Sequence, residues 1–151
     1  PILLFLILLG LVACHESAPD TRSYLIRLTP GQELKTEIMR LTKDKRLEAA
    51  SIVSAVGSLT DVGLRLADKA ETTRYHGHFE VVALSGYLAA DEFHVHMAVS
   101  DGDGKTIGGH VMDNNVVYTT LVVVIQEHLR YRYRREVDPA TGRKELLIKE
   151  R

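Results

Sequence analysis

The chain has 151 residues, which is enough for one domain with a buried core. Hydrophobic residues make up 45% of it and charged residues 26%, values typical of a soluble globular protein. The formal net charge of −1 excludes a strong positive field, the usual basis of unspecific attraction to nucleic acids and anionic membranes.

The first fourteen residues, PILLFLILLGLVAC, form an uncharged apolar run that is too short to span a bilayer as a helix. Their length fits the hydrophobic region of a secretion signal, and the closing Leu11-Val12-Ala13-Cys14 resembles the lipobox of bacterial lipoproteins. We therefore expect a signal peptide over 1–13 that lacks its basic start, lipidation of Cys14, and a polar tether over 14–22. The alternative is that the run is a buried first strand or helix.

This interpretation predicts an exported protein that a lipid anchor holds at the periplasmic face of the cell envelope. Cys14 is also the only cysteine, so the domain has no internal disulfide and no thiolate metal site. Any metal must be held by nitrogen and oxygen ligands.

The folded domain is expected over 23–151. Residues 23–29 (SYLIRLT) have the composition of a strand, and a Pro-Gly pair ends it. Apolar residues recur at helical spacing over 32–43, which predicts an amphipathic helix. Small apolar residues then predict a buried strand, a turn near 58–61 and a further strand over 62–67.

An exposed connection over 68–74 leads into the most strand-rich part of the chain. The expected strands and the terminal hairpin lie at 78–89, 93–100, 106–112, 116–126 and around 138–142. Strands in such excess over one or two helices predict an α+β domain built on a mostly antiparallel sheet. The alternation of strand and helix that marks nucleotide-binding folds is missing, and so is a glycine-rich phosphate loop in its required context.

The stretch FHVHMAVSDGDGKTIGGH, residues 93–110, contains three histidines. Alternate residues of a strand point to the same face and lie about 6.5 to 7 Å apart. His94 and His96 can therefore direct both rings toward one point, which is a common way to supply two metal ligands. His110 follows the next turn and is the candidate for the third.

The length of the intervening loop decides which face His110 joins. A four-residue loop would place it opposite Val95, on the wrong face, unless a bulge at 108–109 corrected the parity. A three-residue loop with Gly104 in a left-handed conformation would place His110 directly across from His96. Either route lets the third imidazole join the pair.

Three neutral imidazoles with an open fourth position suit Zn²⁺ and would also accept Ni²⁺, Co²⁺ or Fe²⁺. The prediction is that His94, His96 and His110 bind a divalent metal, with zinc as the first candidate. The alternative is three histidines that are hydrogen-bonded to their neighbours. His78 and Glu92 are candidates for groups that support the ligands or transfer protons.

Two other stretches invite a functional interpretation. His76 and His78 form a second H-x-H pair, but Gly77 lies between them and exposed histidines are common where a strand begins. Residues 130–135 (RYRYRR) would present arginines on one strand face and tyrosines on the other. We expect the arginines to be solvated and paired with acidic neighbours, with contact to lipid headgroups or an anionic ligand as the alternative.

From about residue 23 to 148 the chain resembles the PPC domain family (plants and prokaryotes conserved, DUF296). Three of the stretches that carry the resemblance are IVSAVGSLTDVGLRL (52–66), GHFEVVALSGYL (77–88) and VVYTTLVVVI (116–125). The fourth and most specific is the H-x-H…G-x-x-x-G-G-H core over 93–110. His78 stands where the family signature Gly-Arg-Phe-Glu-Ile-Leu has arginine.

The resemblance implies an antiparallel sheet fold, a homotrimer and a metal held at the positions of His94, His96 and His110. Plant relatives carry an AT-hook that binds DNA, but these 151 residues contain no Arg-Gly-Arg-Pro hook. That absence and the export signal argue against a DNA-binding role. Independently, the apolar run over 116–125 suits either an intersubunit surface or a central strand.

Two classes of function remain. The first is a metal-binding oligomeric module of unassigned activity that serves binding and assembly. The second is a small metal-dependent enzyme that acts on a small anionic or carbonyl substrate in a cleft between subunits. The sequence shows no Ser–His–Asp type of arrangement for nucleophilic catalysis, because Ser85, Ser100 and Thr119 have no partner His and Asp at meaningful spacing.

Overall fold

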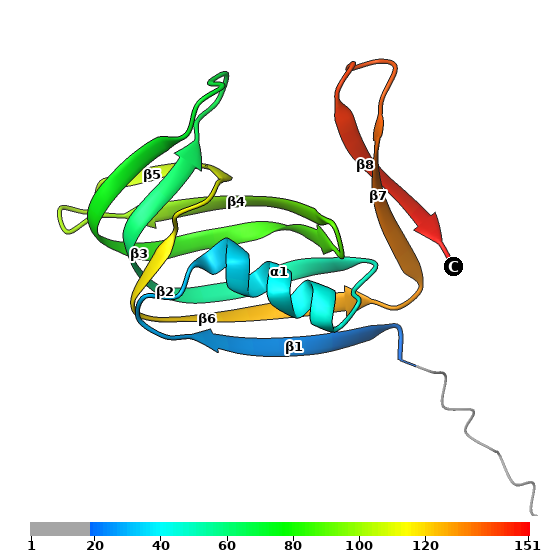
Figure 1. Cartoon of the computed structure of the whole chain (residues 1–151), viewed down its shortest axis with the longest axis horizontal. Helices are drawn as coiled ribbons and strands as arrows, with labels where there is room; N and C mark the ends of the chain where they lie inside the picture. The colour runs from blue at the N-terminus through cyan, green and yellow to red at the C-terminus, as the bar shows by residue number, and fades with distance from the viewer. Residues whose placement is uncertain (1–18) are drawn as a thin grey trace, which may run out of the picture.

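The computed structural model describes residues 19–151 and shows one large antiparallel sheet, one helix and a separate hairpin (Figure 1). The elements are β1 (Thr21–Leu28), α1 (Leu34–Asp44), β2 (Ala50–Arg65), β3 (Thr73–Ala89), β4 (Glu92–Ser100), β5 (Thr106–Val111), β6 (Val116–His128), β7 (Tyr131–Val137) and β8 (Lys144–Glu150). The predicted mostly antiparallel sheet with a packed helix is confirmed. The expected signal segment and Cys14 lie outside the described residues.

Helix α1 forms where the apolar spacing predicts it. Glu33 caps its N-terminus, since the Oε2 atom of Glu33 accepts a hydrogen bond from the backbone N–H of Thr36 at 2.7 Å. The helix buries Leu34 and Ile38 completely and adds the buried Thr42, whose hydroxyl donates to the carbonyl of Ile38. No helix in the described part of the chain is long and apolar enough to cross a membrane.

Strand β2 differs from the sequence prediction. The structure has no turn near 58–61 but one continuous strand of 16 residues, with a shift in pairing between Leu59 and Asp61. A β-bulge of this kind adds a residue to one strand and bends it without ending it. The polar residues that indicated a turn therefore mark a bend in β2.

That bend closes part of the sheet on itself. The strand order is β1-β6-β2-β3-β4-β5, and the end of β2 also pairs with β5, so that β2, β3, β4 and β5 form a ring. Asn115 fastens this closure. Its side chain accepts a hydrogen bond from the N–H of Gly63 in β2 and donates to the carbonyl of Met112 just after β5.

The two faces of the sheet have different environments. The inner face packs with α1 into a core that includes Val95, Met97 and Val99 of β4. Residues that pair directly across antiparallel strands point to the same side. His94 and His96 alternate with the buried residues of β4 and therefore lie on the opposite side, which we call the outer face.

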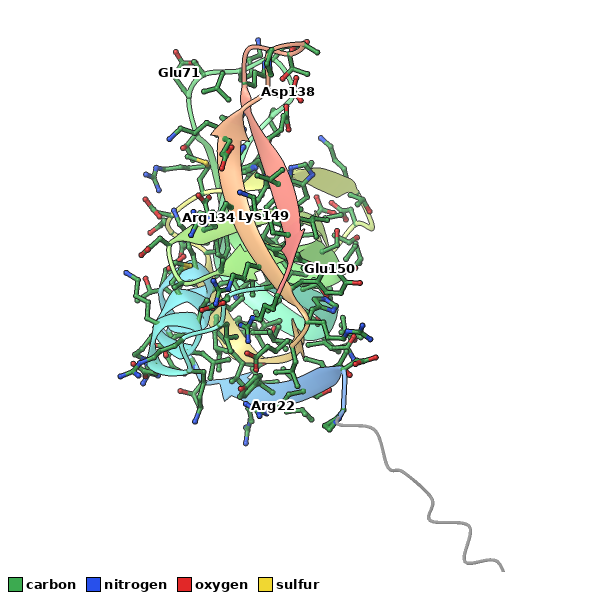
Figure 2. The ribbon with its side chains drawn as sticks, turned by 90° about the vertical axis from the view of Figure 1, so that its right-hand side faces the viewer. Arg22, Glu71, Arg134, Asp138, Lys149 and Glu150 are labelled. Carbon is green, nitrogen blue, oxygen red and sulfur yellow. The ribbon has the colours of Figure 1, made fainter. Side chains whose placement is uncertain are left out.

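The predicted terminal hairpin is confirmed as β7 and β8, which stand apart from the sheet at one end of the molecule (Figure 1). Figure 2 views the molecule from the end that carries this hairpin, with Arg134 and Lys149 on its strands and Asp138 at its turn. The hairpin is joined to the body by a hydrogen bond from the N–H of Tyr133 to the carbonyl of Glu48 at 2.8 Å.

Gly86 of β3 yields a test of the packing beside the histidines. A Cβ atom at this position would lie 2.2 Å from the carbonyl oxygen of His94, and φ is +158°. We predict that Gly86→Ala lowers the free energy of unfolding by roughly 1–3 kcal/mol, because the adjoining strand must shift. Urea unfolding would measure the loss. Gly102→Ala is the control and should change stability by less than about 0.5 kcal/mol, since nothing lies within 4 Å there. Equal effects of the two variants would contradict the prediction.

Candidate metal centre

The turn between β4 and β5 places the third histidine. The N–H of Gly104 donates to the carbonyl of Asp101, the N–H of Asp101 donates to the carbonyl of Lys105, and Gly104 has φ +80°. This is the three-residue loop with a left-handed glycine. It sets His110 directly opposite His96 in the β4–β5 pairing, as that loop predicts, and no correcting bulge occurs at 108–109.

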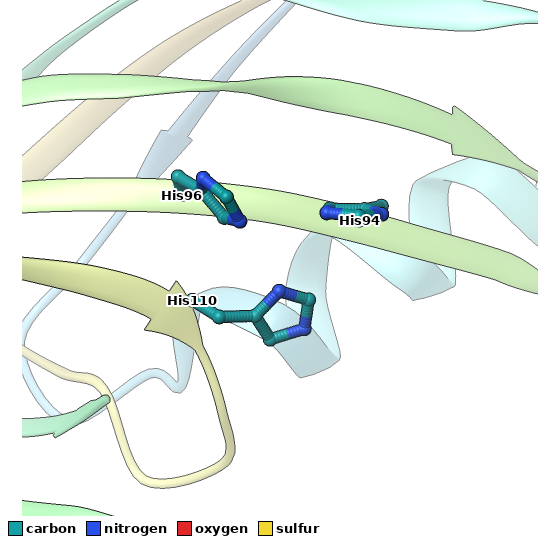
Figure 3. Close-up of side chains that lie close together, drawn as sticks. All are labelled: His94, His96 and His110. Atoms are coloured by element: carbon teal, nitrogen blue, oxygen red, sulfur yellow. The ribbon is translucent and has the colours of Figure 1, made fainter. Parts of the chain in front are cut away.

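The three imidazoles gather on the outer face (Figure 3). Ring centroids lie 5.2 Å apart for His94 and His96, 5.0 Å for His94 and His110, and 5.4 Å for His96 and His110. One nitrogen from each ring lies within 4.8 Å of the other two. The structure thus brings together all three residues that the sequence predicts as ligands.

Tyr87 orients one of the rings. It lies opposite His94 in the β3–β4 pairing, and its hydroxyl is hydrogen-bonded to the Nδ1 atom of His94 at 2.8 Å. Burial raises the pKa of Tyr87, so the phenol stays protonated at neutral pH. This bond occupies Nδ1 and leaves Nε2 of His94 for another partner, which is the arrangement that metal-binding histidines usually have.

His110 has a buried nitrogen without a partner. Its Nδ1 atom is inaccessible to solvent and makes no hydrogen bond with any described residue. Burial lowers the pKa of His110 to about 4, and the neighbouring charges of His94 and Arg65 act in the same direction. Burial also lowers the pKa of His94. Both rings are therefore neutral at pH 7, the form in which imidazole binds metals.

The cluster fits a divalent metal on these observations. Nitrogen ligands lie about 2.0–2.1 Å from Zn²⁺ in a tetrahedral site, so two such ligands are roughly 3.4 Å apart. The rings are already on one face within 4.8 Å, and side-chain rotation supplies the remaining approach. Within residues 19–151 the group contains no fourth His, Cys, Asp or Glu ligand.

The other predicted site residues lie elsewhere or beside the cluster. His76 pairs with Asp61 at 2.8 Å, and His78 stacks on Tyr118 with ring centroids 4.1 Å apart. The structure therefore does not bring this second H-x-H pair into the three-histidine group. Glu92 shares the outer side of β4 with His94, and its charge contributes to the raised pKa of Tyr87.

The arginines of the basic stretch, residues 130–135, have different surroundings. Arg132 forms an ion pair with Glu48 at 2.7 Å, and Arg130 lies 3.6 Å from Asp20, which confirms acidic partners for these two arginines. Arg135 behaves differently. It lies beside Tyr133 on the strand face that approaches the sheet, and its charge contributes to the lowered pKa of His94.

Sequence reasoning missed several residues of this surface. Tyr87 lies seven residues before His94 in the adjoining strand β3, whereas Arg65 lies far from the motif in the chain, and the pairing register brings both beside it. It also missed a bond of 2.9 Å between the hydroxyl of Ser51 and Nε2 of His128, which are 77 residues apart. A tyrosine in the strand paired with an H-x-H motif is the one signal that could have pointed to Tyr87.

The lowered pKa of His110 predicts how the stability of the metal-free protein depends on pH. Between pH 6.5 and about 4 the unfolded chain binds a proton at His110 that the folded chain excludes, so stability is fully present above 6.5 and falls as the pH drops through this window. NMR titration of the His110 ring should give a midpoint near pH 4. A midpoint near 6.5, or a His110→Gln variant with an unchanged pH dependence of unfolding, would show that burial does not act on this ring.

Known proteins resemble this chain in sequence, and others resemble it in structure. Residues 15–129 match the Plants and Prokaryotes Conserved (PCC) domain. The chain is 46% identical over 127 residues to the bifunctional protein GlmU of Synechococcus sp. (strain JA-3-3Ab), a match that covers 84% of this chain. It covers only 20% of that relative, so the chain spans about a fifth of its length.

Two solved structures are also similar. A hypothetical protein from Salmonella enterica has 41% identity and a TM-score of 0.86, with 91% of this chain and 99% of that chain covered. A metal-containing protein from Archaeoglobus fulgidus has 27% identity and a TM-score of 0.66, with 83% and 93% covered. The sequence match extends over most of the chain and the folds agree, and the chain belongs to the Plants and Prokaryotes Conserved domain family.

Proposed function

We propose that this protein binds one divalent metal ion, with zinc as the first candidate, through His94, His96 and His110. The observation that carries the proposal is the convergence of three ring nitrogens within 4.8 Å on one face of the sheet. The buried nitrogen of His110 without a partner and the bond from Tyr87 to His94 support it. The metal-containing relative from Archaeoglobus fulgidus supports it as well.

In this proposal the domain is a binding and assembly module whose metal site recognises a ligand. A second candidate is a small metal-dependent enzyme that acts on a small anionic or carbonyl substrate. One observation favours that candidate. Structural zinc sites have four protein ligands, whereas catalytic sites keep three and leave a position open, and the described part of this chain supplies three. A DNA-binding role by family analogy is the weakest candidate, since the net charge is −1.

We also propose that the protein assembles as a homotrimer. The outer face exposes apolar side chains that a monomer would leave in water: Leu25 (71% exposed), Val56 (69%), Val53 (57%), Val82 (55%) and Val122 (39%). A contiguous surface of this kind is typical of a protein–protein interface. The number three comes from the family resemblance. In this arrangement β6 is a central strand, because it lies between β1 and β2, and it also carries part of the proposed intersubunit surface.

The proposed location is the periplasmic face of the cell envelope, with a lipid on Cys14 as the anchor. The support is the apolar run before Cys14 and the start of the family match at residue 15, directly after it. Such an anchor would place the domain at a membrane without any membrane-spanning segment of its own.

Elemental analysis of the purified protein tests the metal site. We expect about one equivalent of metal, and its loss in a variant with His94→Ala and His96→Ala, because one remaining imidazole cannot hold the ion. The matched control changes the second H-x-H pair, His76→Ala and His78→Ala, and should keep the metal. Equal metal content in the two double variants would contradict the proposal, as would a parent protein that takes up none of Zn²⁺, Ni²⁺, Co²⁺ and Fe²⁺.

Sedimentation equilibrium tests the assembly. The parent protein should sediment as a trimer, and Val56→Glu should shift it toward monomer, because a charge would be buried in the interface. Val137→Glu in the hairpin, a valine that is 64% exposed, is a control of similar exposure away from the sheet. A monomeric parent protein would rule the trimer out.

Mass spectrometry of Cys14 in the full-length protein from a membrane fraction tests the anchor. The expected result is a diacylglycerol adduct on an N-terminal Cys14. A free thiol at Cys14 within an unprocessed, water-soluble chain would refute the lipid anchor.

A further inference from the structure

Two arginines from different elements flank the three histidines. Arg65, the last residue of β2, lies directly opposite His110 where β2 pairs with β5. Residues paired in this way have Cβ atoms about 4.5–5.5 Å apart on the same face. Arg65 therefore extends from the outer face next to the cluster, on the side of β5.

Arg135 reaches the cluster from the hairpin. It lies on the same strand face of β7 as Tyr133, whose ring meets the ring of Tyr87 edge-on at a centroid distance of 6.1 Å. Tyr87 in turn is bonded to His94. Arg135 also lines a hollow of about 510 Å³ together with Tyr133 and Glu92, and none of the three histidines lines that hollow. Arg135 thus stands on the side of the cluster opposite to Arg65.

Neither of these two guanidinium groups has a carboxylate partner at ion-pair distance. Within residues 19–151 neither Arg65 nor Arg135 forms an ion pair, although Arg130 and Arg132 of the same basic stretch do. One terminal nitrogen of Arg135 donates to the carbonyl of Lys144, while its Nε atom is buried without any partner. A buried N–H of a cation without an acceptor is costly, which indicates that an acceptor from a ligand belongs there.

The two arginines place positive charge on two sides of the histidines. Arg65 lies opposite His110, and Arg135 lies on the strand face of Tyr133, whose ring contacts Tyr87 beside His94. Cations on two sides of a site attract anions, and planar guanidinium groups match the oxygens of a carboxylate or a phosphate.

We propose that Arg65 and Arg135 make the three-histidine site selective for a small oxyanion, a carboxylate or a phosphate, which they bind and orient between them. This inference rests on the proposed metal site and names its ligand class. The two arginines act as specificity-determining residues. They would hold the ligand oxygens that point away from the metal.

Anion titration of the cobalt-loaded protein tests the proposal. Cobalt replaces zinc in such sites and reports ligand binding through its visible absorption. The probes are acetate, inorganic phosphate and the uncharged acetamide. We expect acetate or phosphate to bind and acetamide not to bind, and the stronger of the two anions identifies the ligand as carboxylate or phosphate.

Arginine variants locate the selectivity. Arg65→Gln and Arg135→Gln should each weaken anion binding by about tenfold or more at unchanged cobalt content. Arg130→Gln removes the same charge from the same basic stretch, at its pair with Asp20, and should change anion affinity less than about twofold. Binding of acetamide as tight as acetate, or anion affinities that are unchanged in Arg65→Gln and Arg135→Gln, would overturn the proposal.

The same titrations on the metal-free protein, followed by NMR shifts in β4 and β5, separate this inference from the metal site. If the protein takes up no cobalt but still binds anions through Arg65 and Arg135, the metal site is refuted and the role of the arginines is kept. If the protein takes up cobalt but binds anions independently of these arginines, the metal site is kept and the role of the arginines is refuted. Failure of both uptake and anion binding would refute both.

Discussion

The pairing register of β4 and β5 is the constraint on which the candidate centre depends. Strand side chains alternate between faces, so a slip of one residue would move His110 from the outer face into the core. Gly104 prevents this slip because its left-handed conformation closes a three-residue loop. Asp101 reinforces the loop, since its side chain accepts hydrogen bonds from the N–H groups of Asp103 and Lys105. Gly104, between the second and third histidines, thus has a defined role in the site.

The closure of the sheet brings a cation and a hydrogen-bonding phenol to the histidines, two groups that the histidine motif does not itself contain. The bend in β2 brings Arg65 to His110, and the long strand β3 carries Tyr87 to His94. The β7–β8 hairpin contacts the ring of Tyr87 through Tyr133, and Arg135 lies on the same strand face of β7 as Tyr133. Burial and the neighbouring charges lower the pKa values of His94 and His110, so these two rings are neutral at pH 7, and Arg65 and Arg135 lie next to them. Neutral nitrogen donors beside cationic groups suit a metal and an anion at the same time.

The sequence was sufficient for those features that depend on local periodicity. Alternation placed His94 and His96 together, helical spacing located α1, and the turn residues allowed the correct β4–β5 loop among two alternatives. The bend at 58–61 was misread as a turn because polar residues mark bulges and turns alike. Tyr87 lies in the neighbouring strand and could have been found from the β3–β4 pairing. Arg65 and Arg135 could not be found in this way, because their positions depend on pairing between distant strands and on where the β7–β8 hairpin packs, which local patterns do not specify.

The most direct measurement of the central claim is anomalous X-ray diffraction at the zinc absorption edge from crystals of the zinc-loaded protein. The account predicts one strong peak on the outer face, about 2.0–2.1 Å from a single nitrogen of each of His94, His96 and His110. A peak elsewhere in the molecule, or zinc-loaded crystals with the three rings turned away from a common point, would contradict it.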